Sequence, residues 1–289
     1  MISNYLNFID VVALEVSKEL PEYSSKYSRK DFTQRQLVTL YLLKQKSKLS
    51  HDNFVDDFST RDSAIERLGL IKVPRASTLK MFARRIPCFV LEILIGFCVI
   101  KVDNRKLQTA TDATGFQLED GSYSYLKMPG IATKKRKNLK LSGCADINKQ
   151  LFTSVKIRKK NRHDNIGFQI LIKKTKKNTK RKIRTNKADK AYDAEKNHEF
   201  AERERFEHIS QLRNKTKQYY RIKGKHRKKL FKQFPKKKYH KRSIIETMWF
   251  CIKRSCGKVI FAKKWIMQKK ELLAKVLAYN VNRLAKIIK

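Results

Sequence analysis

The spacing of apolar and polar residues divides the chain into a helical first part and a mixed second part. Within residues 31–87, short apolar runs follow residues that commonly begin or end helices. These signals are Thr33 with Gln36 as a capping box, Ser50 and Ser77 as N-caps, and Gly69 as a terminator. The apolar stretch 88–102 contains Glu92 and is too short to span a bilayer comfortably, so we predict a buried element there. The pattern predicts a helical N-terminal region and connector over residues 1–104.

Beyond residue 106 the period of the pattern changes. Segments that alternate or are rich in β-branched residues predict three neighbouring strands, in LQTATDATGF (107–116), LSGCADI (141–147) and LFTSVKIR (151–158). We then expect a helix through IGFQILIKK, capped by Asp164, and a fourth strand around 183–189. Strands followed by a helix, a strand and further helices predict an α/β or α+β core over residues 105–289.

The stretch YHKRSIIETMWFCIK at 239–253 has a helical period. If it is helical, four polar residues lie on one face, because they are separated by nearly whole turns: Tyr239, Arg242, Glu246 and Lys253. The opposite face carries Ile244, Ile245, Met248, Cys251 and Ile252, as expected of a helix packed on a core. Taken alone, the polar face is explained by a solvated surface with an Arg242–Glu246 pair.

The charge of the chain indicates its partner. Its 69 Lys and Arg against 26 Asp and Glu give a net charge of +43, which predicts binding to a polyanion, and nucleic acid is the leading candidate. The segments 173–187 and 221–242 contain no Asp or Glu, and such blocks bind phosphates. We interpret residues of about 194–241 as a charged, partly helical insertion before the final core helix. A membrane surface is a less favoured partner, because the sequence shows neither an amphipathic anchor nor a lipidation signal.

Two further features concern compartment and DNA contact. The first twenty residues lack a basic segment before an apolar one and do not resemble a secretory signal, and the five cysteines have no paired metal spacing, so we expect an intracellular protein with structural thiols. Lys80, Arg84 and Arg85 would suit a helix-turn-helix pressed on DNA. A helical packing module with exposed bases explains them equally well, and both interpretations stay open.

Two aspartates at strand ends need an explanation in so basic a chain. Asp112 lies in TATDATGF, near the C-terminal end of the first predicted strand, and Asp189 occupies the comparable place in the fourth. Each alone could be a turn carboxylate. Together with Glu246 they would repel one another unless cations neutralise them, and their oxygens are ligands suited to two Mg²⁺ or Mn²⁺ ions. Two such metals can drive an in-line displacement at a phosphodiester.

These residues resemble a known family. The spacing Tyr239, Arg242, Glu246, Lys253 is similar to the signature around the third catalytic carboxylate of bacterial and archaeal insertion-sequence transposases of the DDE class. DATGF at Asp112 and DKAYD at Asp189 resemble the two Asp motifs of that family, in the same order.

The second Asp motif differs from the family pattern at one position. Ala191 stands where relatives often have Gly, which leaves Asp193 as an alternative to Asp189, although Asp193 also suits the N-cap of the next helix. The resemblance covers most of the chain from about residue 107 onward, and the helical first part is weakly similar to the DNA-binding region of such enzymes.

The resemblance implies a ribonuclease-H-like core in which Asp112, Asp189 and Glu246 are catalytic and hold two divalent ions. It implies that Arg242 and Lys253 contact DNA phosphates and that Tyr239 positions an end nucleotide. The partners would be double-stranded DNA, both element ends and target, bound by a homodimer at the nucleoid in the cytoplasm of a prokaryotic cell.

Three functions therefore compete. The first is a transposase that binds the terminal inverted repeats of its element, cleaves the DNA and transfers the strand to a target. The second is a non-catalytic DNA- or RNA-binding protein, such as a decayed or domesticated copy, because the charge alone would serve it. The third is a nuclease or resolvase on the same core that cuts without joining.

Overall fold

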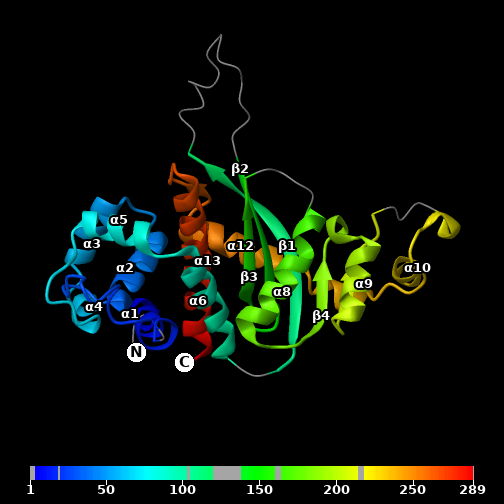
Figure 1. The fold of residues 1–289 in the computed structure, drawn as a ribbon, viewed down its shortest axis with the longest axis horizontal. Coiled ribbons are helices and arrows are strands. Elements are labelled where there is room, and N and C mark those ends of the chain that lie inside the picture. Colours follow the sequence, from blue (N-terminus) through cyan, green and yellow to red (C-terminus); the bar gives the residue numbers. More distant parts are fainter. Residues whose placement is uncertain are drawn as a thin grey trace, which may run out of the picture. The chain divides into compact units, whose positions relative to one another are not determined.

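The computed structural model describes residues 4–18, 20–102, 105–119, 138–159, 164–213 and 218–288. They form two compact units, one from Met1–Val102 with Cys251–Lys289 and one from Asp103–Phe250. Figure 1 colours the chain in sequence order and shows the helices of the first unit and the sheet of the second.

The first unit is helical. Its elements are α1 (Asn4–Asp10), a π-helical turn (Val11–Val16), α2 (Gln34–Ser47), α3 (His51–Ser59), α4 (Asp62–Arg67), α5 (Ala76–Arg85), α6 (Cys88–Ile100), the short strand β6 (Val259–Ile260) and α13 (Trp265–Ile287). The long helix α13 packs against α6 and α2. Its buried residues include Leu272, Val276 and Leu284, which recur at helical spacing and supply the core.

The caps of these helices follow the sequence signals in most cases. Thr33 and Gln36 form the predicted capping box of α2, and the Ser50 hydroxyl accepts a hydrogen bond from the Asn53 N–H at the start of α3. The predicted N-cap at Ser77 is wrong, because Arg75 has the extended backbone that precedes α5 and Ser77 lies inside the first turn. The apolar stretch forms α6, and among the described residues no helix is long and apolar enough to cross a membrane.

The second unit contains a mixed sheet, as predicted for an α/β chain. Its strands are β1 (Leu107–Leu118), β2 (Asn138–Asp146), β3 (Leu151–Arg158), β4 (Ile183–Ala188) and β5 (Glu207–Ser210). They lie side by side in the order β3-β2-β1-β4-β5 (Figure 1). β2 is antiparallel to β1 and β3, whereas β4 is parallel to β1 and β5. The four predicted strands are confirmed; β5 was not predicted.

Helices surround this sheet. The remaining elements are η2 (Asp164–Gly167), α8 (Phe168–Thr179), η3 (Lys190–Tyr192), α9 (Glu195–Arg203), η4 (Tyr219–Arg221), α10 (Lys225–Lys232), α11 (Lys236–His240) and α12 (Ser243–Cys256). Asp164 opens a 3₁₀ turn, and Gly167 precedes α8 directly, so the predicted cap of α8 by Asp164 is wrong.

The two faces of the sheet have different neighbours. On one face the Ser154 hydroxyl donates to the carbonyl of Leu171 in α8 (2.9 Å). On the other, the Trp249 ring of α12 packs against Phe152 in a tilted arrangement, with centroids 4.3 Å apart. Trp249 also covers Gly143, where a Cβ would lie 2.8 Å from the indole ring. The glycine is therefore needed for α12 to approach β2 this closely.

This close approach predicts the effect of two alanine substitutions. Gly143→Ala should lower the free energy of unfolding by about 1–3 kcal/mol, because overpacking forces the ring or the strand to move. Gly115→Ala on β1 is the matched control, since a Cβ there meets nothing within 4 Å, and its effect should stay within about 0.5 kcal/mol. Urea unfolding of the two variants beside the wild type measures both, and equal effects would contradict the packing of α12 on Gly143.

Candidate active site

Asp112 and Asp189 are brought together by the pairing of β1 with β4. The last pair of this parallel ladder is Thr111 with Ala188, so Asp112 is the next residue of β1 and Asp189 is the first residue after β4. Neighbouring strands are about 4.8 Å apart, which places the two backbones side by side. β1 continues to Leu118, so the prediction that Asp112 lies near the end of its strand is wrong. It lies in mid-strand, at the level where β4 stops.

A buried network fixes this pairing. The Asn186 amide of β4 donates to the hydroxyls of Thr109 (2.9 Å) and Thr111 (2.8 Å) on β1. The Asn186 side-chain oxygen contacts His208 Nδ1 of β5 at 3.2 Å. Since Asn186 is fully buried, loss of these bonds would leave polar groups unsatisfied. Sequence reasoning missed Asn186, because a single Asn in a polar strand carries no pattern.

Asp112 points toward the face that α12 covers. It is paired directly with Gly143 of β2, and directly paired residues point to the same side of a sheet. Trp249 covers Gly143 on that side, and Glu246 precedes Trp249 by about one turn of α12. The indole contact thus places the first turn of α12 over the level of Asp112.

The stretch 239–253 is not one helix. α11 ends at His240 and α12 begins at Ser243, so Arg242 lies in the turn between them and the prediction of a continuous polar face is wrong. The apolar side also differs, because Trp249 is buried and Cys251 is exposed. The turn is closed by a hydrogen bond from the Arg242 N–H to the Tyr239 carbonyl (2.8 Å).

Three of the four polar residues still come together despite this break. Arg242 forms an ion pair with Glu246 (2.7 Å), and its guanidinium lies 5.6 Å from the centre of the Tyr239 ring. The Glu246 side chain is 52% exposed, so the pair adds little to stability and mainly holds the carboxylate in place. The Arg242 Nε is buried and has no hydrogen-bond partner among the described residues.

The pKa of Asp112 responds to the charges of both other carboxylates. Burial raises the pKa of Asp112 to about 6; the Ala113 N–H and Arg242 oppose this rise, whereas Glu246 and Asp189 add to it. The charges of Asp189 and Glu246 also contribute to the raised pKa of Tyr239, which burial mainly causes. The structure thus places Asp112 beside Asp189, and the charges of Glu246 and of its partner Arg242 also act on Asp112.

A metal fits this cluster by chemistry. Carboxylate oxygens are hard ligands that Mg²⁺ and Mn²⁺ prefer, and a cation beside the half-buried Asp112 would stabilise its charged form. Among the described residues, no three His, Cys, Asp or Glu side chains already converge as a metal site. Glu246 is held by Arg242, and Asp189 accepts a hydrogen bond from the Lys190 N–H at 2.6 Å.

The other predicted DNA contacts lie elsewhere. Lys253 is on α12, two turns after Glu246 and on the same side of the helix. Lys80, Arg84 and Arg85 are on α5 of the first unit. Lys80 forms an exposed ion pair with Asp52 at 2.9 Å. Lys80 and Arg84 line one pocket, whereas Arg85 lines another.

Asp193, the alternative to Asp189, has a different environment. Its carboxylate is fully buried and accepts two hydrogen bonds from the Arg227 guanidinium of α10, both 2.9 Å. It also accepts the Arg213 N–H at 3.0 Å. Ala194 is the N-cap of α9, so the predicted capping role of Asp193 is wrong. These contacts show that Asp193 links α10 to the segment between β4 and α9.

The cluster predicts how the pKa of Asp112 responds to substitution. Glu246→Gln removes a neighbouring negative charge, so the pKa should fall below about 6, whereas Arg242→Gln removes a positive charge and should raise it. Glu207→Gln serves as the control, because Glu207 lies on β5 paired with Lys238. Carboxyl NMR titration in the presence of chelator measures the values. If neither substitution changes the pKa of Asp112, Glu246 and Arg242 lie too far from Asp112 to act on it.

The ion pair of Asp193 predicts a stability effect. Arg227→Ala should cost roughly 2–4 kcal/mol, because it leaves a buried carboxylate without its charge partner. Lys238→Ala is the matched control, since the Lys238–Glu207 pair has side chains 59% and 42% exposed and should contribute under about 1 kcal/mol. Urea unfolding measures the free energy of unfolding of both variants. Similar small decreases in the two would contradict a structural role of the Arg227–Asp193 pair.

Comparison with known proteins adds one match. Residues 103–281, more than half of the chain, match the family model described as "Transposase DDE domain". The search of curated proteins and the search of solved structures found no match.

Proposed function

We propose that this chain, which belongs to the transposases with a DDE domain, binds the terminal inverted repeats of its own mobile element, cleaves the DNA there and joins the freed 3′ end to target DNA. The observation that carries the proposal is the register of β1 and β4, which sets Asp112 beside Asp189 on the face that α12 and Glu246 cover, in a chain of net charge +43. The mixed sheet with α8 and α12 on opposite faces is compatible with a ribonuclease-H-like core.

In this proposal Asp112, Asp189 and Glu246 are the catalytic carboxylates. They would hold two Mg²⁺ or Mn²⁺ ions, which would activate the attacking water or 3′-hydroxyl and stabilise the leaving oxygen. Arg242 forms an ion pair with Glu246. We expect a metal ion to replace Arg242 as the partner of the Glu246 carboxylate. The Arg242 guanidinium is then released toward a DNA phosphate, a group that it binds in a bidentate manner.

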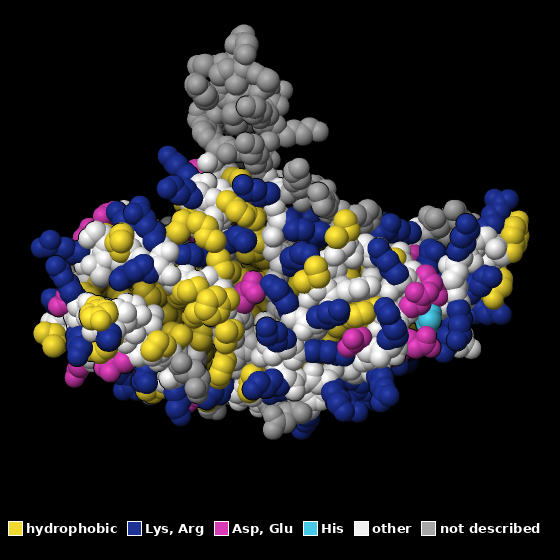
Figure 2. Space-filling view, in the orientation of Figure 1, with side chains coloured by type: hydrophobic (Ala, Val, Ile, Leu, Met, Phe, Trp, Pro, Cys, Tyr) yellow, Lys and Arg dark blue, Asp and Glu magenta, His cyan; other side chains and the backbone are white. Residues whose placement is uncertain are grey.

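The remaining predicted residues would position the DNA. Lys253 follows Glu246 on the same side of α12 and is proposed to contact a backbone phosphate, whereas Tyr239 is proposed to hold an end nucleotide. Figure 2 shows Lys and Arg side chains over much of the visible face, with few Asp and Glu among them. Such a surface supplies affinity without sequence preference, and it weakens as salt rises. We propose that the protein acts as a dimer at the nucleoid of a prokaryotic cell, because the two ends of the element must be held together during the reaction.

The direct test is cleavage of a labelled duplex that carries the sequences flanking the gene, in Mg²⁺, Mn²⁺ or chelator. Wild type should nick at the element ends only with metal, and Glu246→Gln should lose more than about 100-fold in rate, because even the loss of a group behind a ligand costs roughly 10- to 100-fold. Glu207→Gln should cleave normally. Both variants should retain DNA binding in a gel-shift assay.

The other outcomes separate the alternatives. Tight binding without cleavage in any metal would favour a non-catalytic binding protein. Cleavage without joining of the labelled end to a supercoiled plasmid would favour a nuclease or resolvase. Equal cleavage by wild type and Glu246→Gln would reject the assignment of Glu246.

A further inference from the structure

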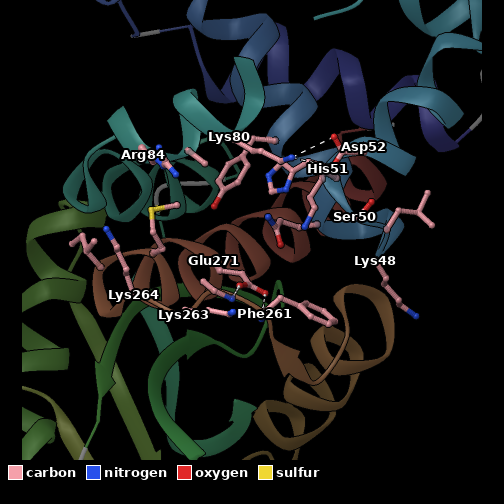
Figure 3. Close-up of a pocket in the computed structure, with 18 residues that line it drawn as sticks. Lys48, Ser50, His51, Asp52, Lys80, Arg84, Phe261, Lys263, Lys264 and Glu271 are labelled. Carbon is pink, nitrogen blue, oxygen red and sulfur yellow. Dashed lines mark hydrogen bonds and ion pairs between the residues drawn. The ribbon is translucent and has the colours of Figure 1, made fainter. Parts of the chain in front are cut away.

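The first unit contains a pocket that the proposed chemistry does not use. Its volume is about 790 Å³, within the range of about 300–1,000 Å³ typical of small-molecule sites. It lies between the end of α2, the start of α3, the last turns of α5 and the segment that leads into α13. In Figure 3, His51 and Lys80 lie on one side of it and Glu271, Phe261 and Lys263 on the other.

Specific hydrogen bonds hold the walls of this pocket. The Glu271 carboxylate accepts the N–H groups of Phe261 (3.3 Å) and Ala262 (3.0 Å), which fixes the segment before α13. Lys270 Nζ donates to the carbonyl of Arg84 (2.5 Å) and so joins α13 to the end of α5. The pocket is therefore formed by folding of the unit and needs no ligand to assemble.

The pocket carries an excess of positive charge. Its cations are Lys44, Lys48, Lys80, Arg84, Lys263 and Lys264, against the carboxylates of Asp52 and Glu271. Lys80 is paired with Asp52, and Glu271 is paired with Lys275 at 3.4 Å. Among the described residues, the other five cations form no ion pair. They would all favour an anionic ligand.

Lys44 is the most informative of these cations. Its side chain lines the pocket although the residue is only 9% exposed, and within the described part of the chain its ammonium has no hydrogen bond. Burial lowers its pKa, and the charge of Glu271 opposes that shift. Most of the Lys44 side chain is shielded from water, so an anion in the pocket would meet its charge in a medium that screens it weakly.

His51 provides a neutral polar group beside this charge. Burial, Lys44 and Lys80 lower the pKa of His51 to about 4, so its ring is neutral at pH 7. Its Nε2 is buried and has no hydrogen-bond partner in the described residues. His51 is also the first residue of α3, where free backbone N–H groups favour negative charge.

The pocket is too large and too apolar for an inorganic anion alone. Tyr41, Phe261, Ile266 and Met267 line it together with the cations. We propose that it binds a nucleoside phosphate, whose base would lie against these apolar side chains and whose phosphate would meet Lys44 and the exposed Lys263 and Lys264. The ligand would be a free nucleotide or an unpaired nucleotide at a DNA end, because pairing hides the base in a duplex. The proposal goes beyond strand cleavage and needs none of the three catalytic carboxylates.

The test uses the full chain and a fluorescent deoxyadenosine monophosphate, with binding followed by anisotropy in chelator. Replacing both Lys263 and Lys264 with Gln should weaken binding about tenfold or more, because two charge-assisted hydrogen bonds to the phosphate are lost. Replacing both Lys258 and Lys286 with Gln removes the same charge at exposed positions outside the pocket, and should weaken binding less than about twofold. Lys44→Gln, checked for native unfolding behaviour, should resemble the pocket variant.

Competition identifies the source of the ligand. If DNA with an unpaired end displaces the nucleotide and a blunt duplex does not, the ligand is a strand end. If neither DNA displaces the nucleotide, the ligand is a free nucleotide. Both results support a nucleotide site in this pocket. The proposal is overturned if the nucleotide does not bind saturably, if inorganic phosphate binds as tightly, if the blunt duplex competes equally, or if the two double variants lose equal affinity. None of these results bears on metal-dependent cleavage, so failure here leaves the proposed function intact.

Discussion

The parallel pairing of β1 with β4 is the constraint on which the candidate active site depends. It ends at Thr111 and Ala188, and this register places Asp112 and Asp189 at the same level of the sheet although 76 residues lie between them. Asn186 fixes the register by bonds to Thr109 and Thr111. A shift by one residue would turn one of the two carboxylates to the opposite face. The site thus rests on a buried amide that takes no part in the proposed chemistry.

The position of the third carboxylate, Glu246, depends on how α12 packs on the sheet. Gly143 is opposite Asp112 in the sheet and leaves space for the Trp249 indole, so α12 lies close to the face from which Asp112 projects. This arrangement sets Glu246 near the two aspartates, where their mutual repulsion contributes to the raised pKa of Asp112. Arg242 offsets part of that repulsion. Carboxylates that need cations are suited to bind metal, and Arg242 beside them is suited to bind phosphate, which connects the packing of α12 to the proposed function.

The sequence predicted the parts of this arrangement that depend on local pattern. Alternation in β1 to β4 and the capping box at Thr33 could be read directly. The break between α11 and α12 was missed, because helical spacing continues through Lys241 and Arg242 although the backbone turns there. β5 was also missed, since four residues with a buried His208 become a strand only by pairing with β4.

Some features of the site required the structure. The spacing of Asp112, Asp189 and Glu246 suggested the family, but their proximity depends on the register of distant strands. Asn186 and Gly143 gave no sequence signal, because their roles come from neighbours on other strands and helices. The pocket of the first unit likewise joins residues of α2 and α3 to the segment before α13, which are more than 200 residues apart.

Iron-mediated backbone cleavage tests the central claim most directly. Fe²⁺ is bound in place of Mg²⁺ and, with ascorbate and peroxide, produces radicals that cut the chain near the metal. If the three carboxylates form one metal centre, mass spectrometry should find cuts close to Asp112, Asp189 and Glu246 together, and excess Mg²⁺ should suppress them. Cuts confined to the histidines around His198 and His226, or cuts near only one of the three carboxylates, would contradict the account.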